Sequence, residues 1–241
     1  MKKRLVFLFF LILISSCFFQ FSWKAADDDF VFYEANPKQE NVRFYLKDDD
    51  GNNFGSIAGL KASLAKDKKE LLFAMNGGMY KKDKSPQGLF IENSIVRNNL
   101  DTADGGGNFY LKPNGVFFID TNNRPGIVKT EDFKYGKNVL YATQSGPMLL
   151  IDGETHKAFS KDSRNLNIRN GVGILPNGRI LFAMSKKEIS FYDFAQFFKN
   201  KGCKNALYLD GFVSRAYCPK QDWVQTDGDF GVIIGVTKSK I

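Results

Sequence analysis

Residues 171–184 read GVGILPNGRILFAM, two apolar runs joined by Pro176-Asn177-Gly178. Proline fixes the backbone at the start of a turn, and Asn-Gly accepts the left-handed conformation that a tight hairpin requires. The stretch therefore predicts two antiparallel strands, residues 171–175 and 179–184. The same Pro-Asn-Gly sequence at residues 113–115 interrupts the apolar run 109–120 and predicts a second hairpin.

Further strands and two helices follow from the spacing of apolar residues. Residues 56–69 place Ile57, Leu60 and Leu64 on one helical face, and Ser190 can cap a helix that ends at Gly202. The expected fold is α+β: a single strand-rich domain of curved, mostly antiparallel or mixed sheets with a few covering helices. More strands are expected at residues 30–33, 42–46, 70–75, 88–96, 205–209 and 231–236.

The N-terminus has the pattern of an export signal. Residues 2–4 are basic, and the apolar run 5–14 is shorter than the roughly 20 residues that span a bilayer. Ser15-Ser16-Cys17 resembles a bacterial lipobox, which predicts a signal over residues 1–17, lipidation at Cys17, a tether over 18–29 and a domain over 30–241. The protein is then a periplasmic or cell-envelope lipoprotein held to the membrane by its lipid. An ordinary signal peptide and an uncleaved anchor are the alternatives.

Charge and cysteine content limit the partners. The formal charge is +8, and without residues 2–4 there are 31 basic and 26 acidic residues, a net charge of +5. This dispersed excess favours anionic ligands such as phosphate esters, whereas a nucleic-acid site would need a basic stripe with aromatics. With one histidine and no Cys-x-x-Cys, we expect neither zinc nor another cofactor. Cys203 and Cys218 either form a disulfide or remain two buried thiols.

Several polar or glycine-containing segments directly follow apolar strands. A rigid sheet can present such loops to a ligand, and glycine lets the backbone approach a substrate closely. Each segment alone is also explained by a turn that requires glycine. The segments are Asn76-Gly77-Gly78-Met79-Tyr80, Gly105-Gly106-Gly107-Asn108-Phe109, Gln144-Ser145-Gly146-Pro147, Arg169-Asn170-Gly171 and Asp210-Gly211-Phe212-Val213-Ser214-Arg215.

Together these segments resemble the phosphodiester glycosidases, the family of the uncovering enzyme and of many bacterial envelope proteins. The matching stretches AMNGGMY, QGLFIEN, GGGNFYLKPNGVFFI, ATQSGPMLLIDG, RNGVGILPNG and ALYLDGFVSRAY lie within residues 70–236 in the family's order. One departure concerns the substrate: better-known members carry Leu-Asp-Gly-Gly-Gly-Ser-Ser, whereas this chain has Phe212, Val213 and Arg215 at the divergent positions. The resemblance implies a hydrolase that cleaves a sugar from a sugar-1-phosphodiester.

That reaction assigns roles to residues of the matching stretches. A departing phosphate ester is already a good leaving group, so the site chiefly needs a phosphate clamp and a carboxylate. Arg169 and Arg215 are the candidate clamp, and Asp210 is the candidate carboxylate with Glu92 as the second. The side chains of Asn76, Arg169 and Asp210 are expected in one pocket, with Asp210 near an arginine. Candidates for orienting or contacting the substrate are Gly77, Gly78, Gln144, Ser145, Gly146, Asn170, Gly211 and Ser214.

Simpler interpretations apply to the same residues. Asp-Gly at a strand end is often a turn, an arginine in a strand often faces solvent, and Glu92 could be an exposed hairpin carboxylate. His156 is expected at the surface. The alternative function is a non-catalytic lipoprotein that binds envelope glycans or phosphorylated polymers in the same pocket.

Overall fold

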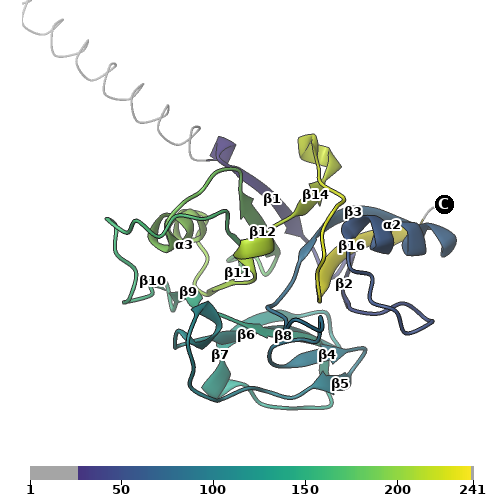
Figure 1. The fold of residues 1–241 in the computed structure, drawn as a ribbon, viewed down its shortest axis with the longest axis horizontal. Helices are drawn as coiled ribbons and strands as arrows, with labels where there is room; N and C mark the ends of the chain where they lie inside the picture. Colours follow the sequence, from purple (N-terminus) through teal and green to yellow (C-terminus); the bar gives the residue numbers. More distant parts are fainter. Residues whose placement is uncertain (1–26, 240–241) are drawn as a thin grey trace, which may run out of the picture. The chain divides into compact units, whose positions relative to one another are not determined.

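Three antiparallel sheets make up most of the structure, a computed structural model that describes residues 27–239. The expected signal segment and Cys17 lie outside the described residues. The chain divides into the units Met1–Phe30 and Val31–Ile241, and the sheets belong to the second unit. All the strand pairs whose register is defined are antiparallel. The α+β prediction is thus confirmed (Figure 1).

The strand order in each sheet shows how distant parts of the chain combine. The first sheet runs β1 (Phe30–Ala35), β12 (Ile180–Ser185), β11 (Asn170–Ile174), β13 (Ala206–Tyr208), β9 (Met148–Ile151) and β10 (Glu154–Thr155). The second runs β15 (Trp223–Val224), β14 (Ala216–Cys218), β3 (Lys69–Asn76), β16 (Ile233–Ser239) and β2 (Asn41–Tyr45). The third runs β5 (Ile95–Asn98), β4 (Phe90–Glu92), β8 (Val139–Ser145), β6 (Gly115–Asp120) and β7 (Pro125–Lys129).

Both predicted helices are present, and the expected cap at Ser190 is joined by a second cap at Ser56. In α2 (Ile57–Lys66) the Ser56 hydroxyl accepts a hydrogen bond from the Gly59 amide at 3.1 Å, and in α3 (Phe191–Asn200) Ser190 accepts from the Asp193 amide at 3.0 Å. Such caps satisfy amides that the first helical turn leaves unpaired. α2 packs on β3 of the second sheet, and α3 lies beside β9 and β11 of the first (Figure 1).

One phenylalanine-rich core joins the three sheets. The Phe182 ring of the first sheet stacks on Phe73 of the second at 5.4 Å and meets Phe117 of the third edge-on at 5.9 Å. Phe117 in turn lies 5.3 Å from Phe44 of the second sheet. Aromatic pairs at these separations stabilise a core beyond the area they bury. The high phenylalanine content is therefore used to lock the sheets together.

Two strand predictions need correction. The hairpin around residues 176–178 is confirmed by β11 and β12, but residues 113–115 form no hairpin. Residues before them form the 3-10 turn η1 (Asn108–Tyr110), and the Asn114 side chain donates to the Phe109 carbonyl at 2.9 Å. The predicted strand 88–96 is instead the hairpin β4–β5, because Asn93 and Ser94 adopt φ of 51° and 63°.

The structure also corrects the possible disulfide and the predicted surface position of His156. Cys203 and Cys218 are both buried and free, so the alternative of two separate thiols holds and the disulfide is wrong. Cys203 follows α3 and packs near Gly173, whereas Cys218 lies in β14 of another sheet, which separates the two sulfurs. His156 was expected at the surface, but it is 4% exposed, and its Nε2 contacts the Lys112 carbonyl at 3.1 Å.

Candidate functional site

The three sheets meet at the end of β13, where the chain turns at Asp210. Ser145, the last residue of β8, donates its hydroxyl hydrogen to the Leu209 carbonyl at 2.8 Å. Asn170, the first residue of β11, accepts from the Leu209 amide through its own carbonyl at 3.1 Å. Both side chains are fully buried, so these bonds form away from water. The backbone that carries Asp210 is therefore fixed by two different sheets.

Asn76, at the end of β3, makes the third attachment. Its side-chain amide donates to the Asp210 carbonyl at 2.6 Å, and its side-chain oxygen accepts from the Arg215 amide at 3.0 Å. Its own carbonyl accepts from the Asn170 side chain at 2.9 Å. Asn76 thus holds both ends of the segment between Asp210 and Arg215. We call Asn76, Ser145 and Asn170 the junction.

The turn between Asp210 and Arg215 is also fixed from within. Gly211 begins the 3-10 turn η3 (Gly211–Val213), and its amide donates to the Tyr208 hydroxyl at 3.0 Å. A Cβ on Gly211 would stand 2.1 Å from that hydroxyl oxygen, so only glycine fits. Ser214 donates to the Gly211 carbonyl at 2.8 Å. The turn leaves Asp210 partly exposed.

Charged and phenolic side chains are linked to this turn through Tyr80 and Arg215. We call Tyr80, Lys84, Arg215, Asp227 and Asp229 the rim. The Tyr80 hydroxyl and the Lys84 ammonium donate to the Asp229 carbonyl at 2.7 and 2.8 Å, and the same ammonium pairs with the Asp229 carboxylate. Arg215 Nε lies 3.0 and 2.9 Å from the two carboxylate oxygens of Asp227. The two cations of the rim are thus each paired with a carboxylate, Lys84 with Asp229 and Arg215 with Asp227.

The pKa of Tyr80 shows that Asp210 lies near it. Burial raises this pKa, and the negative charges of Asp210 and Asp229 raise it further, to about 12. Tyr80 therefore stays protonated at neutral pH and keeps its hydrogen bond to the Asp229 carbonyl. Of the rim, the sequence interpretation named only Arg215. Tyr80 ends the matching stretch AMNGGMY and could have been singled out, but Lys84, Asp227 and Asp229 lie in ordinary charged turns.

Arg169 does not share a pocket with Asn76 and Asp210, which corrects the prediction. Successive side chains of a strand point to opposite faces, and Asn170 already points to Asn76. Arg169 is fully buried and lies 3.6 Å over the Phe191 ring, with Nε and Nη2 donating to the carbonyls of Ile189 and Asn165 at 2.8 and 2.7 Å. Tyr208 lies between it and Gly211. Nε and Nη2 of Arg169 are thus bound to backbone carbonyls, and Arg215 pairs with Asp227.

The other glycines proposed to contact substrate are packed against protein. A Cβ would stand 2.7 Å from Val232 Cγ1 at Gly77, 2.3 Å from Thr143 Oγ1 at Gly78 and 2.5 Å from Asn114 Cβ at Gly146. All three are buried. They are required where strands and loops approach each other closely, so the expectation that Gly77, Gly146 and Gly211 line one ligand concavity is wrong.

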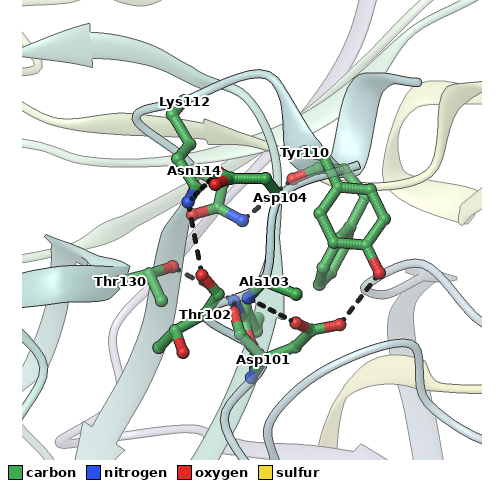
Figure 2. A network of polar contacts seen from close by, with 10 residues as sticks. Asp101, Thr102, Ala103, Asp104, Tyr110, Lys112, Asn114 and Thr130 are labelled. Atoms are coloured by element: carbon green, nitrogen blue, oxygen red, sulfur yellow. Dashed lines mark hydrogen bonds and ion pairs between the residues drawn. The ribbon is translucent and has the colours of Figure 1, made fainter. Parts of the chain in front are cut away.

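Gln144 also has a structural role. Its Oε1 accepts from the amides of Leu89 and Asp101 at 3.0 and 2.9 Å, and its Nε2 donates to the Asp101 carbonyl at 2.6 Å and the Thr130 hydroxyl at 3.2 Å. All its hydrogen-bonding positions are used within the protein. Figure 2 shows the surrounding network, in which Asp101 also accepts from the Tyr110 hydroxyl. The interaction of Gln144 with substrate is therefore not supported.

Glu92 lies in a different part of the molecule from the junction. It forms a loose pair with Arg97 at 3.6 Å, and burial raises its pKa despite that neighbour. It lines a groove whose walls do not include Asp210. Glu92 is thus neither a freely exposed hairpin carboxylate nor a second carboxylate at the Asp210 turn.

Residues 27–239 contain no group of three or more histidine, cysteine, aspartate or glutamate side chains arranged to hold a metal ion. Over the same residues, no helix combines the length and apolar character needed to cross a membrane.

Comparison with known proteins identifies the family of this chain. Residues 69–231 match the model of the phosphodiester glycosidase family, which makes this a protein of glycosidase type. The chain belongs to that family. It is 38% identical over 186 residues to the uncharacterized protein YigE of Escherichia coli, covering 77% of this chain and 72% of YigE.

Two solved structures share the fold. The catalytic domain of zebrafish N-acetylglucosamine-1-phosphodiester alpha-N-acetylglucosaminidase, auto-inhibited by its pro-peptide, has a TM-score of 0.55 at 14% identity, over 86% of this chain and 82% of that one. A hypothetical protein from Synechocystis has a TM-score of 0.53 at 14% identity, over 86% and 59% of the two chains. At this identity the likeness concerns the fold alone.

Proposed function

We propose that the protein is an exported hydrolase that cleaves a sugar from a sugar-1-phosphodiester in the cell envelope, with Asp210 as its principal carboxylate. The observation that carries this proposal is the placement of the partly exposed Asp210 on a backbone held by Asn76 and Ser145, with the phenol of Tyr80 nearby. A positioned carboxylate can activate water or stabilise the positive charge that develops on the sugar.

The rim contains two cationic hydrogen-bond donors of the kind that bind phosphate. The guanidinium of Arg215 and the ammonium of Lys84 already hold carboxylate oxygens of Asp227 and Asp229, and phosphate oxygens are bound by the same donors. In the proposed complex these cations contact the phosphate, and Asp210 faces the anomeric carbon. Because the phosphate ester leaves readily, no strong general acid is required. The name of the zebrafish enzyme points to the same substrate class.

Export and lipidation are part of the proposal and rest on the sequence of residues 1–17. Cys17→Ala should block maturation and release the protein from the membrane fraction, while Ser16→Ala, which keeps a small residue, should process normally. Unchanged membrane attachment of Cys17→Ala would leave an ordinary signal or an anchor.

The enzymatic proposal is tested with the full-length protein and a panel of sugar-1-phosphodiesters, including N-acetylglucosamine-1-phosphodiester, with and without chelator. Asp210→Asn should reduce turnover at least about a thousandfold, as for removal of other essential groups, with an unchanged melting temperature. Asp222→Asn, which alters an exposed aspartate remote from the turn, is the matched control. Full activity of Asp210→Asn would refute the role of Asp210.

A binding function is the second candidate, and the position of Glu92 favours it. Glycosidases ordinarily use two carboxyl groups on opposite sides of the bond, and Glu92 lies elsewhere. A protein that binds the panel without turnover, and loses binding in Arg215→Gln, would be a glycan-binding lipoprotein.

A further inference from the structure

Arg169 is a buried cation that has no role in the reaction proposed above. Its side chain is 0% exposed, and among the described residues no carboxylate lies within 4.0 Å of it. The guanidinium is held instead by two backbone carbonyls and by the face of the Phe191 ring, 3.6 Å away. Because apolar side chains fill such places at a lower cost than a buried charge, the guanidinium indicates a role beyond packing.

Tyr208 lies between this cation and the Asp210 turn. Its ring packs edge-on against Phe191 with the centroids 4.8 Å apart, and its centroid lies 5.7 Å from the guanidinium carbon of Arg169. Tyr208 is only 2% exposed, so its ring has little room to turn. Arg169 and Phe191 therefore fix the direction in which the Tyr208 hydroxyl points.

The Tyr208 hydroxyl binds the peptide unit that joins Asp210 to Gly211. Its oxygen accepts from the Gly211 amide at 3.0 Å, and the carbonyl of the same peptide unit accepts from the Asn76 side chain at 2.6 Å. Because a peptide unit is planar, partners at both its nitrogen and its oxygen fix the orientation of the whole plane. Tyr208 and Asn76 together therefore set the backbone direction on the C-terminal side of Asp210.

The charges of Arg169 and Asp210 both act on the Tyr208 phenol. Burial raises the pKa of Tyr208 to about 12, the charge of Arg169 lowers it against that effect, and the charge of Asp210 raises it. The phenol thus lies near both charges and stays protonated at neutral pH. Its oxygen already accepts from the Gly211 amide, so the hydroxyl hydrogen is left to be attracted by the negative charge of Asp210.

We propose that Tyr208, held in place by Arg169, is a positioning residue that orients Asp210 and favours its ionised form. Arg169 acts through Tyr208 and does not contact the substrate. The inference rests on the proposed function for its effect on turnover, whereas its effect on Asp210 can be measured without substrate.

The first test is Tyr208→Phe, which keeps the ring and removes the hydroxyl. With the full-length protein and the panel of sugar-1-phosphodiesters, kcat should fall about tenfold to a hundredfold, as for a misplaced reacting group, while KM changes by less than about twofold. Tyr141→Phe is the matched control, because it removes a buried hydroxyl that donates to Asn93 at 2.8 Å in the third sheet. Equal kcat values for the two variants would overturn the inference.

The contribution of Arg169 is tested by keeping or removing its charge. Arg169→Lys should retain a higher kcat than Arg169→Gln, because lysine keeps a positive charge near the phenol. Equal values for the two variants would show that Arg169 does not act on Tyr208 through its charge, which would overturn its part in the inference. If neither variant folds, Tyr208→Phe alone decides.

The measurement without substrate is a pH titration of the Asp210 carboxyl carbon by NMR, with its signal assigned by Asp210→Asn. The pKa of Asp210 should be higher in Tyr208→Phe than in the wild-type protein, because the carboxylate loses a nearby donor. It should not change in Tyr141→Phe. If the wild-type protein cleaves no member of the panel, the proposed function fails and this titration decides the inference: an unchanged pKa in Tyr208→Phe overturns it.

Discussion

The junction and the rim both belong to the Asp210 turn, but they differ in burial, in charge and in the groups that they bind. Asn76, Ser145 and Asn170 are almost completely buried, are uncharged and bind mainly backbone groups. In the rim, Arg215 and Asp227 are 39% and 64% exposed and bind each other through charge. Buried hydrogen bonds are costly to break, whereas exposed ion pairs contribute little to stability. The most recognisable sequence motifs therefore build the buried support of the turn, and less distinctive charged residues form its exposed rim.

The largest effect is expected at the junction. Asn76→Ala leaves the Asp210 carbonyl and the Arg215 amide without their partner, and each buried unpaired group costs about 1–3 kcal/mol. The free energy of unfolding, measured in urea, should fall by about 3 kcal/mol. Asn52→Ala, at an exposed turn, should change it by less than about 0.5 kcal/mol. A small loss in Asn76→Ala would show that the junction does not hold the turn.

A rim substitution should show the opposite pattern. Arg215→Lys keeps the charge but loses the planar pair of donors, so we expect kcat/KM to fall about tenfold to a hundredfold. The free energy of unfolding should change by less than about 0.5 kcal/mol, because the pair with Asp227 is exposed. Arg124→Lys, at another exposed arginine that is paired with a carboxylate, is the control for activity. A large stability loss without an activity loss would place Arg215 with the junction.

The carboxylates of the rim should compete with the substrate. Asp227→Asn weakens the hold on Arg215 and leaves it available to phosphate, so the KM of the phosphodiester should fall about threefold, within the energy of an exposed ion pair. Inhibition by inorganic phosphate should strengthen by the same factor. A higher KM would mean that Asp227 instead positions Arg215 for binding.

The smallest effect concerns His156, a buried titratable group outside both regions. Its Nδ1 accepts from the Ala158 amide at 3.1 Å, and burial lowers its pKa below the ordinary value of 6.5. The unfolded chain binds the proton more readily, so the free energy of unfolding should decrease as pH falls through 6.5 toward the lower folded-state pKa. His156→Gln should lose this part of the pH dependence. Parallel stability curves for the two proteins would exclude the effect.

The sequence predicted the elements that are determined locally. Ser190 caps a helix as predicted, residues 57–66 form the helix that the spacing of Ile57, Leu60 and Leu64 indicated, and the turn at residues 176–178 is a hairpin. The turn at residues 113–115 was misassigned because the Asn114 side chain binds the Phe109 carbonyl, and β6 pairs with β7 and β8. Such partners come from tertiary contacts that turn propensity does not contain.

The candidate site was predictable in part for a similar reason. Asn76, Ser145, Asn170, Asp210 and Ser214 were singled out at strand ends, and the structure gathers them around one turn. The direction of the Arg169 side chain depends on the face of β11, which its position at a strand start did not reveal. Lys84 and Asp229 meet only because the segments after β3 and before β16 lie together.

The place of β16 in the second sheet has a consequence for the order of folding. β16, the last strand described, lies between β2 and β3, so both of those strands keep a free edge until residues 233–239 have left the ribosome. Unpaired edges invite association with other chains, and pairing between such distant segments is slow. Because Ile233 pairs with Asn76, the strand that supplies the third attachment of the Asp210 turn is fixed only after β16 has been made.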